Sequence, residues 1–182
     1  MPPLTPRALR ARLRRVRLVL MDVDGVLTDG RIFHLVDTKG ELVEFKGIGA
    51  QDAIALTWLA ARGIQTGVIS GRKSRGAGER LKLLGMTHIH QGRLDKKAVF
   101  AGICRRARIR PEETVYMGDD LPDLPVIRAA GVGAAPADAR PEVRAAAAWV
   151  ARREGGRGAV RELCEAVLKA QGLWPQVLDC FR

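Results

Sequence analysis

Two carboxylates that are two positions apart, Asp22 and Asp24, follow an apolar run from Val16 to Met21. An apolar run bounded by Gly and Asp is typical of a buried strand that ends in a loop. One of these carboxylates could attack an electrophile or bind a cation, and the other could carry a proton. Gly25 comes next and allows a ligand to approach the backbone closely. The segment therefore predicts a catalytic site rather than a solvated acidic turn.

The elements that must position these carboxylates alternate between short strands and helices. Such alternation is typical of an α/β fold with a parallel sheet, in which chemistry gathers at the carboxyl ends of the strands. Two short alternating runs, 31–35 and 41–45, flank a Gly-containing turn and predict a β-hairpin. We expect further strands at 65–69, 88–90, 114–117, 132–134 and 149–150, and helices at 52–62, 74–84, 96–108, 121–130 and 160–171.

Three later segments carry polar residues where such an edge would collect them. Ser70 ends the strand in Val68-Ile-Ser-Gly-Arg72, Lys96 begins a helix, and an acidic cluster ends the segment from Val115 to Asp123. With the segment Asp22 to Gly30, these sequences resemble the four motifs of the haloacid dehalogenase (HAD) superfamily of phosphohydrolases, in the same order. The resemblance implies a HAD-like Rossmannoid three-layer sandwich with a central parallel sheet, formed by one domain over residues 1–182.

The resemblance also implies Mg²⁺-dependent hydrolysis of a phosphate monoester through an aspartyl-phosphate. Asp22 would be the nucleophile, and Asp24 would act as general acid and then as general base. Ser70 would donate a hydrogen bond to a phosphoryl oxygen. Lys96 would neutralise the developing negative charge, and Lys97 would take that role if the register were off by one.

Oxygen ligands suit Mg²⁺. By resemblance, the metal would be held by the side chains of Asp22 and Asp119 and by the backbone carbonyl of Asp24. Asp120 and Asp123 would orient waters or Lys96. The sequence has no cluster of His or Cys residues that would favour zinc instead.

Many HAD enzymes carry a cap domain over the substrate, but this chain has no room for one. The interval from Asp24 to Ser70 is used up by the hairpin, a helix and a strand, and the interval from Ser70 to Lys96 is shorter. Nearly the whole chain resembles the capless branch formed by the phosphatases of 3-deoxy-D-manno-octulosonate 8-phosphate (KDO 8-P), which serve lipopolysaccharide biosynthesis. The resemblance lies in the hairpin and in Asp22 to Gly30, Ser70 to Ser74, Arg80, Leu84-Gly85, Gln91-Gly92, Gly118 to Asp123 and Gly155 to Glu162. That resemblance implies a homotetramer in which hairpins assemble and the C-terminal tail, about 151–182, reaches a neighbour's active site.

Substrate contacts are also implied by this resemblance. We expect them from Gly71 and Arg72 after the second strand, from Arg80, and from Arg157 in the tail, with Arg161 as a further candidate. One segment departs from the family. Phe45 is kept, but the Arg-Asp-Gly core that follows it in the family is absent at the same offset, and Asp52 could replace its Asp only after a shift.

Composition limits the other readings. The 182 residues have a net charge of +11, and six arginines lie between Arg7 and Arg17. A nucleic-acid arm is one interpretation, but Leu9, Leu13 and Val16 recur at helical spacing and favour a solvated amphipathic helix capped by Thr5-Pro6. No aromatic residues interleave the arginines, which argues against a nucleic-acid partner.

Three cysteines, no signal peptide and no apolar stretch of bilayer length predict a cytoplasmic protein with no membrane partner.

Three functions remain open on the sequence alone. The first is hydrolysis of a KDO 8-P-like sugar-acid phosphate. The second keeps the chemistry but changes the substrate to a sialic-type 9-phosphate or a polynucleotide 3′-phosphate, and DNA binding that weakens steeply with salt would indicate the latter. The third is a non-catalytic, oligomeric module that binds a phospholigand, for which loss of Asp22, Asp24 or Lys96 would be expected.

Overall fold

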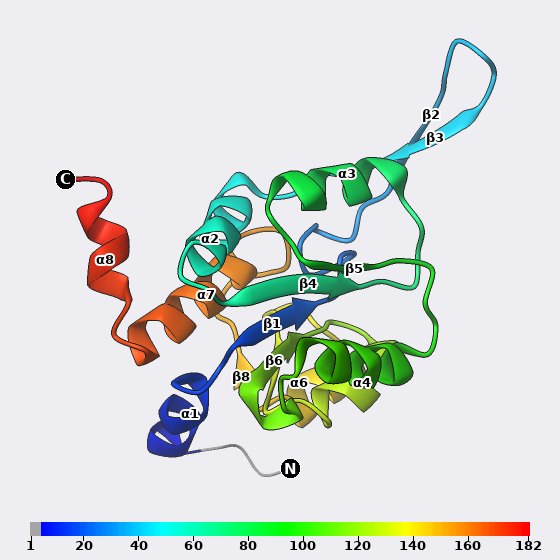
Figure 1. Cartoon of the computed structure of the whole chain (residues 1–182). Coiled ribbons are helices and arrows are strands. Elements are labelled where there is room, and N and C mark those ends of the chain that lie inside the picture. Colours follow the sequence, from blue (N-terminus) through cyan, green and yellow to red (C-terminus); the bar gives the residue numbers. More distant parts are fainter. Residues whose placement is uncertain (1–4) are drawn as a thin grey trace.

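The centre of the structure, a computed structural model that describes residues 5–182, is a six-stranded parallel sheet (Figure 1). The strand order is β5-β4-β1-β6-β7-β8. Parallel neighbours require long crossover connections, which is why helices separate most of the strands along the chain. The expected parallel α/β sheet is confirmed. Its strands are β1 (Leu18–Met21), β4 (Gln65–Ile69), β5 (His88–His90), β6 (Thr114–Met117), β7 (Val132–Ala135) and β8 (Trp149–Val150).

Helices cover both faces of this sheet and complete the three-layer sandwich (Figure 1). Residues of β1 alternate between two cores, because successive side chains of a strand point to opposite faces. Val19 and Met21 belong to one core, and Leu18 and Leu20 belong to the other. The first core includes residues of α1 (Pro6–Leu13), α2 (Ala50–Ala60), α3 (Arg75–Leu83) and α7 (Ala159–Ala170), and the second those of α4 (Lys96–Ala107), α5 (Leu124–Ile127) and α6 (Pro141–Ala146).

The register of the three central strands sets the position of the loops that follow them. Met21 of β1 pairs with Val68 of β4 and with Met117 of β6. The residues just beyond these strands therefore leave the sheet at nearly the same level. This alignment brings three segments that are far apart in the sequence to one edge.

The hairpin of β2 (Phe33–Val36) and β3 (Leu42–Phe45) projects away from the body of the molecule (Figure 1). Its turn is closed by Asp37, whose Oδ1 accepts hydrogen bonds from the N–H groups of Lys39 (2.8 Å) and Glu41 (2.9 Å). Between β1 and β4, where every residue is described, the chain forms only this hairpin and α2, so no cap domain is present there.

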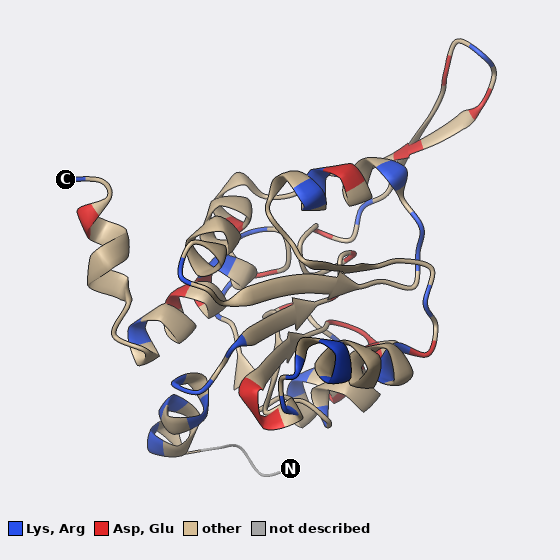
Figure 2. Ribbon diagram, viewed as in Figure 1, with Lys and Arg blue, Asp and Glu red and all other residues tan. Residues whose placement is uncertain are grey.

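Three of the six N-terminal arginines, Arg7, Arg10 and Arg12, lie on the packed helix α1. Thr5 accepts a hydrogen bond from the N–H of Ala8, Pro6 is the first residue of α1, and Leu13 is buried. Figure 2 shows Lys and Arg on α1, α3 and α4 rather than on one helix alone. The expected amphipathic helix is confirmed. Among residues 5–182, no helix is both long and apolar enough to cross a bilayer.

One expectation about the second half of the chain is wrong. The helix expected over 121–130 is instead a 3-10 turn, Leu121–Asp123, followed by the single-turn helix α5. Pro122 and Pro125 lack an N–H, and the Asp120 side chain takes the N–H of Leu121, so the segment begins as a turn. Within the region 151–182, the helix expected over 160–171 is confirmed as α7, which contributes Leu163, Cys164, Val167 and Leu168 to the core.

Two short helices, α6 and α8 (Trp174–Asp179), were not expected from the sequence. α8 lies beyond α7, at the opposite side of the molecule from the hairpin (Figure 1). Its Trp174 packs edge-on against Trp58 of α2, with ring centroids 5.8 Å apart. The C-terminal helix is therefore attached to its own chain.

Candidate active site

A cleft of about 300 Å³ opens where β1, β4 and β6 end. Loops at the carboxyl ends of parallel strands are the usual place for chemistry in such a fold. Most of the residues proposed from the sequence lie together here. They are Asp22, Asp24, Ser70, Gly71, Arg72, Lys96, Asp119, Asp120 and Asp123, and Ile32, Arg93 and Leu94 join them in the lining.

Asp22 is the first residue after β1 and is held from two sides. Its Oδ1 accepts the N–H of Val23 (2.7 Å), and its Oδ2 accepts a hydrogen bond from Lys96 Nζ (2.7 Å). Burial and the nearby Asp123 raise the pKa of Asp22 to about 6, although Lys96 opposes the rise. The carboxylate is thus oriented and partly desolvated, as a nucleophile must be.

Lys96 and Asp123 form the buried floor of the cleft. Lys96 Nζ donates to Asp123 Oδ1 (2.7 Å), and the hydroxyl of Tyr116 donates to the same oxygen (2.6 Å). Burial opposes the charge of Lys96, but Asp123 and Asp22 outweigh it and raise the lysine pKa. Lys96, rather than its exposed neighbour Lys97, therefore enters the site with a stable positive charge.

Asp123 has no oxygen left over for a ligand. Its Oδ2 accepts the backbone N–H groups of Asp119 (3.1 Å) and Asp120 (3.3 Å), and the residue is fully buried. These contacts fix the loop that carries Asp119. Asp123 thus holds other groups in place, in line with the orienting role implied for it.

Asp119 has the features of a metal ligand. Burial, Asp123 and Asp22 raise its pKa to about 7, and its Oδ1 is buried without a hydrogen-bond partner. One oxygen from each of Asp22, Asp119 and Asp123 lies within 4.8 Å of the others. The negative charges of these carboxylates repel one another. A hard divalent cation beside Asp22 and Asp119 would reduce that repulsion and give Asp119 Oδ1 a partner, so the residues fit Mg²⁺.

Gly25 makes this arrangement possible. Its φ is +80°, a conformation that residues with a Cβ rarely adopt, and a Cβ at this position would collide with the Asp119 carboxylate. The glycine after the two aspartates therefore allows the loops after β1 and β6 to approach each other.

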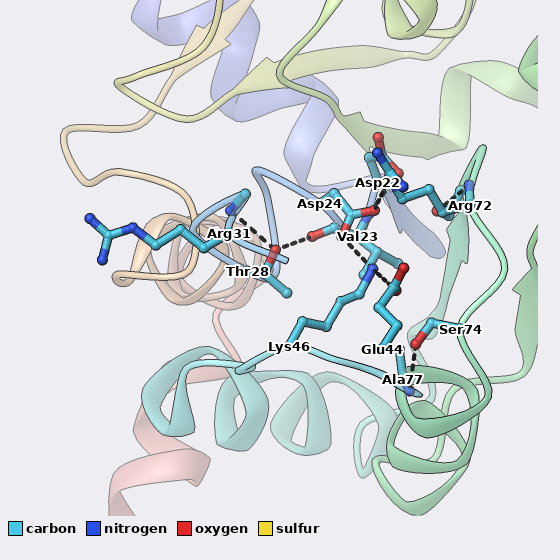
Figure 3. Close-up of polar contacts among 12 residues, drawn as sticks. Asp22, Val23, Asp24, Thr28, Arg31, Glu44, Lys46, Arg72, Ser74 and Ala77 are labelled. Carbon is cyan, nitrogen blue, oxygen red and sulfur yellow. Dashed lines mark hydrogen bonds and ion pairs between the residues drawn. The ribbon is translucent and has the colours of Figure 1, made fainter. Parts of the chain in front are cut away.

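Asp24 lies on the hairpin side of the cleft (Figure 3). Its Oδ1 is 2.6 Å from Lys46 Nζ, and its Oδ2 is 3.8 Å from Arg72 Nε. Ser70 directly follows β4 and is buried, and its Oγ accepts the N–H of Arg72 (3.2 Å). This contact leaves the serine hydroxyl hydrogen available for donation into the cleft.

Two of the proposed substrate contacts lie elsewhere in the chain. Arg80 lines a separate cleft at the base of the hairpin, together with Glu44, Phe45 and Lys46. Arg157 is exposed and lies 4.0 Å from Asp29 in an ion pair. Within one chain, the fold brings neither arginine into the cleft of Asp22.

The glycine-rich segment before α7 packs on its own chain. Gly156 donates its N–H to the carbonyl of Val26 (2.8 Å), and Gly155 donates to Asp138 Oδ1 (2.9 Å). Asp52 is fully buried and accepts the N–H groups of Gly158 (3.0 Å) and Arg161 (2.8 Å). Asp52 therefore caps the start of α7 and does not line the cleft of Asp22.

Sequence reasoning missed three polar residues of the site, Lys46, Arg93 and Tyr116. A usable signal existed for Tyr116, because it is the one aromatic hydroxyl in the strand that leads into the acidic loop. No spacing signal pointed to Lys46, which reaches Asp24 because the base of the hairpin, just after β3, lies beside the loop that follows β1. Long-range contacts of this kind are set by the tertiary fold.

In this parallel sheet, the three central strands are followed within two residues by Asp22, Ser70 and Asp119, and Lys96 is paired to the first aspartate. This arrangement defines a HAD-like hydrolase. The profile of the haloacid dehalogenase-like hydrolase family matches residues 49–131. Over 162 residues the chain is 40% identical to the 3-deoxy-D-manno-octulosonate 8-phosphate phosphatase KdsC of Escherichia coli, with 89% of this chain and 84% of that protein covered.

Solved structures agree with this assignment. The phosphatase of Moraxella catarrhalis, solved with a magnesium ion, a phosphate ion and a KDO molecule, is 35% identical with a TM-score of 0.91. The match covers 98% of this chain and all of that one (100%). The phosphatase of Yersinia pestis is 37% identical with a TM-score of 0.86, over 91% of this chain and 88% of that one. The chain therefore belongs to the KdsC phosphatase family of the HAD-like hydrolases.

Proposed function

We propose that this enzyme hydrolyses the phosphate ester of KDO 8-P, with Mg²⁺ as cofactor and through an aspartyl-phosphate intermediate. The observation that carries the chemistry is the pairing of a half-buried Asp22 with Lys96, next to the unpartnered oxygen of Asp119. The similarity to KdsC phosphatases over most of the chain supports the substrate. A cytoplasmic role in lipopolysaccharide biosynthesis is part of this proposal.

The first half-reaction divides its work among four side chains. Asp22 attacks phosphorus in line, and the bond to the leaving sugar oxygen breaks as Asp24 gives that oxygen a proton. Lys96 balances the charge that spreads over the phosphoryl oxygens, and the hydroxyl of Ser70 donates to one of them. In the second half-reaction Asp24 takes a proton from water, which attacks the aspartyl-phosphate and releases phosphate.

The metal would be held by Asp22, Asp119 and the backbone carbonyl of Asp24. When bound, Mg²⁺ supplies positive charge that offsets the cluster of carboxylates and polarises the phosphoryl group. Asp120 and Asp123 would orient the residues around the metal without binding it. Asp123 would do so through its hydrogen bonds with Lys96 and with the Asp119 backbone.

Recognition of the sugar acid is proposed to involve Gly71, Arg72, Arg80 and Arg157. Gly71 and Arg72 line the cleft, whereas Arg80 and Arg157 would reach a substrate only across a subunit boundary. We propose a homotetramer, supported by the projecting hairpin, whose Phe33 and Phe45 are stacked and half exposed. Because no cap domain lies between β1 and β4, the cleft would be covered by a neighbouring subunit of this tetramer.

A substrate screen tests the proposal most directly. It should compare KDO 8-P with a sialic-type 9-phosphate, a simple sugar phosphate and a 3′-phosphorylated oligonucleotide. The highest kcat/KM is expected for KDO 8-P, EDTA should abolish turnover, and added Mg²⁺ should restore it. Turnover that survives exhaustive chelation would contradict the metal site, and a preference for the oligonucleotide would contradict the substrate.

A further inference from the structure

Lys46 is a buried lysine that the proposed reaction does not use. It directly follows β3, and only 2% of its side chain is exposed. Its Nζ lies 2.6 Å from Asp24 Oδ1 and 3.0 Å from Glu44 Oε1, so one ammonium bridges two carboxylates (Figure 3). A lysine this buried carries a large desolvation cost, and the two partners offset it.

Lys46 reaches Asp24 from behind the cleft. Asp24 and Arg72 line the active-site cleft, whereas Lys46 and Glu44 line the neighbouring cleft at the base of the hairpin. The ammonium thus holds the Asp24 oxygen that points away from Arg72. The other oxygen, Oδ2, remains directed toward Arg72, within the cleft.

The orientation of the Asp24 carboxylate depends heavily on this contact. Among the described residues, the hydrogen bond from Lys46 is the one side-chain hydrogen bond that this carboxylate accepts. The alternative partner, Arg72, is 3.8 Å away, and its own side chain is 58% exposed. An exposed ion pair of that length contributes little to orientation.

We propose that Lys46 is a positioning residue, which fixes the Asp24 carboxylate so that one oxygen faces the leaving group. This inference rests on the acid–base role proposed for Asp24. Lys46 also connects the hairpin to the proposed acid–base residue, because it immediately follows β3 and its ammonium pairs with Glu44 of β3 as well as with Asp24. A displacement of the hairpin is therefore transmitted to Asp24.

The first test is kinetic and uses a simple sugar phosphate, so that it does not depend on the natural substrate while its alkoxide leaving group still needs the proton of Asp24. Lys46→Met should lower kcat by about 10- to 100-fold, the usual cost of a misplaced catalytic group. KM should change by less than about threefold, because the lysine does not contact the substrate. Lys46→Arg should restore part of kcat, and Lys39→Met at the exposed hairpin turn should match the wild type.

A double-mutant cycle then separates positioning from general damage. In an Asp24→Asn background, Lys46→Met should cause no further loss of kcat, because the lysine acts only through that carboxylate. An unchanged kcat in Lys46→Met, a rise in KM alone, or additive losses in the double variant would each overturn the proposal. Glu44→Gln is the milder variant, since it leaves the contact with Asp24 in place.

The melting temperature provides a reading that does not require turnover. Lys46→Met should lower it more with Asp24 present than in the Asp24→Asn background, because the ion pair is lost only in the first case. If the wild type hydrolysed no phosphate ester, the proposed function would fail, and this coupling would then decide alone whether Lys46 holds Asp24. Equal shifts in the two backgrounds would show that it does not.

Discussion

The cleft and the hairpin meet at Lys46 but are held in opposite ways. In the cleft, the fully buried Asp123 accepts hydrogen bonds from Lys96, Tyr116 and two backbone N–H groups. In the hairpin, the strand residues are largely exposed, and the two strands contact mainly each other. The polar cleft is thus held together within one chain, whereas the apolar side chains of the hairpin have no second layer of the same chain packed against them.

This difference indicates which parts of the function one chain completes by itself. Phe33 and Phe45 stack with centroids 5.3 Å apart, and each remains 49% exposed. A two-stranded hairpin is marginally stable alone, and the proposed homotetramer would bury this surface against another copy. Catalytic groups should therefore respond to single substitutions inside the chain, and assembly should respond to substitutions in the hairpin.

Asp22→Asn should have the largest effect. Removal of the nucleophile should lower kcat by at least about 10⁴-fold, as the loss of such groups does in other enzymes. The melting temperature should stay near that of the wild type, because the amide can still accept the N–H of Val23. Steady-state kinetics measures the loss, with the exposed Asp29→Asn as the control. Near-normal turnover would rule out the aspartyl-phosphate.

Lys96→Met should damage both catalysis and stability. The variant leaves Asp22 and Asp123 without their shared cation, and removing one partner of a buried ion pair costs about 3–5 kcal/mol. The kcat should also fall by about 10²- to 10³-fold, because the phosphoryl charge loses its stabilising group. Urea unfolding and kinetics measure the two losses, and Lys97→Met is the matched control. Equal effects at both lysines would contradict the assignment of Lys96.

Phe33→Ser/Phe45→Ser should break assembly while sparing the cleft. Light scattering should report about four chains per particle for the wild type and fewer for the variant. The kcat/KM for KDO 8-P should fall by about tenfold, and that for p-nitrophenyl phosphate should fall less, because only the larger substrate uses contacts across subunits. A fully active monomer of the wild type would instead show that the hairpin has another use.

The smallest effect expected is a pH dependence of stability in the metal-free protein. The pKa values of Asp22 and Asp119 are raised to about 6 and about 7 from the ordinary 3.8. Folding therefore favours their protonated forms, and this contribution is complete below the ordinary pKa and is lost as the pH rises through the raised values. Mg²⁺ should increase the melting temperature more at pH 8 than at pH 5. A larger increase at pH 5 would contradict the carboxylate site.

Much of the cleft could be predicted because its residues stand next to strand ends. Asp22, Ser70 and Asp119 each lie within two residues of the end of a strand, and parallel connections bring those ends to one edge. The helix expected at 121–130 failed for a local reason, since Pro122 and Pro125 break the regular hydrogen bonding that its apolar spacing suggested. The correct prediction of the cleft residues and the wrong prediction of the helix therefore both depend on residues that are close together in the sequence.

The C-terminal region shows the opposite case. By resemblance it is a tail that reaches another subunit, and a deletion of the residues after Ala151 would remove it. In the fold, however, Leu163 and Val167 of α7 are fully buried, so that deletion would unfold the protein. A chain ending at Gly172, which removes only α8, is the milder variant.

The sequence by itself determined the parallel sheet, the order of the four motifs and the residue types able to transfer a phosphoryl group, because these depend on periodicity and on short spacings. Only the tertiary structure decided which oxygens are free and which charges are paired. In the structure, Lys96 and Tyr116 donate hydrogen bonds to Asp123, and Lys46 donates one to Asp24. Asp119 Oδ1 is left without a partner. These contacts join residues distant in the chain, and burial and orientation set their energies, so no local pattern could specify them.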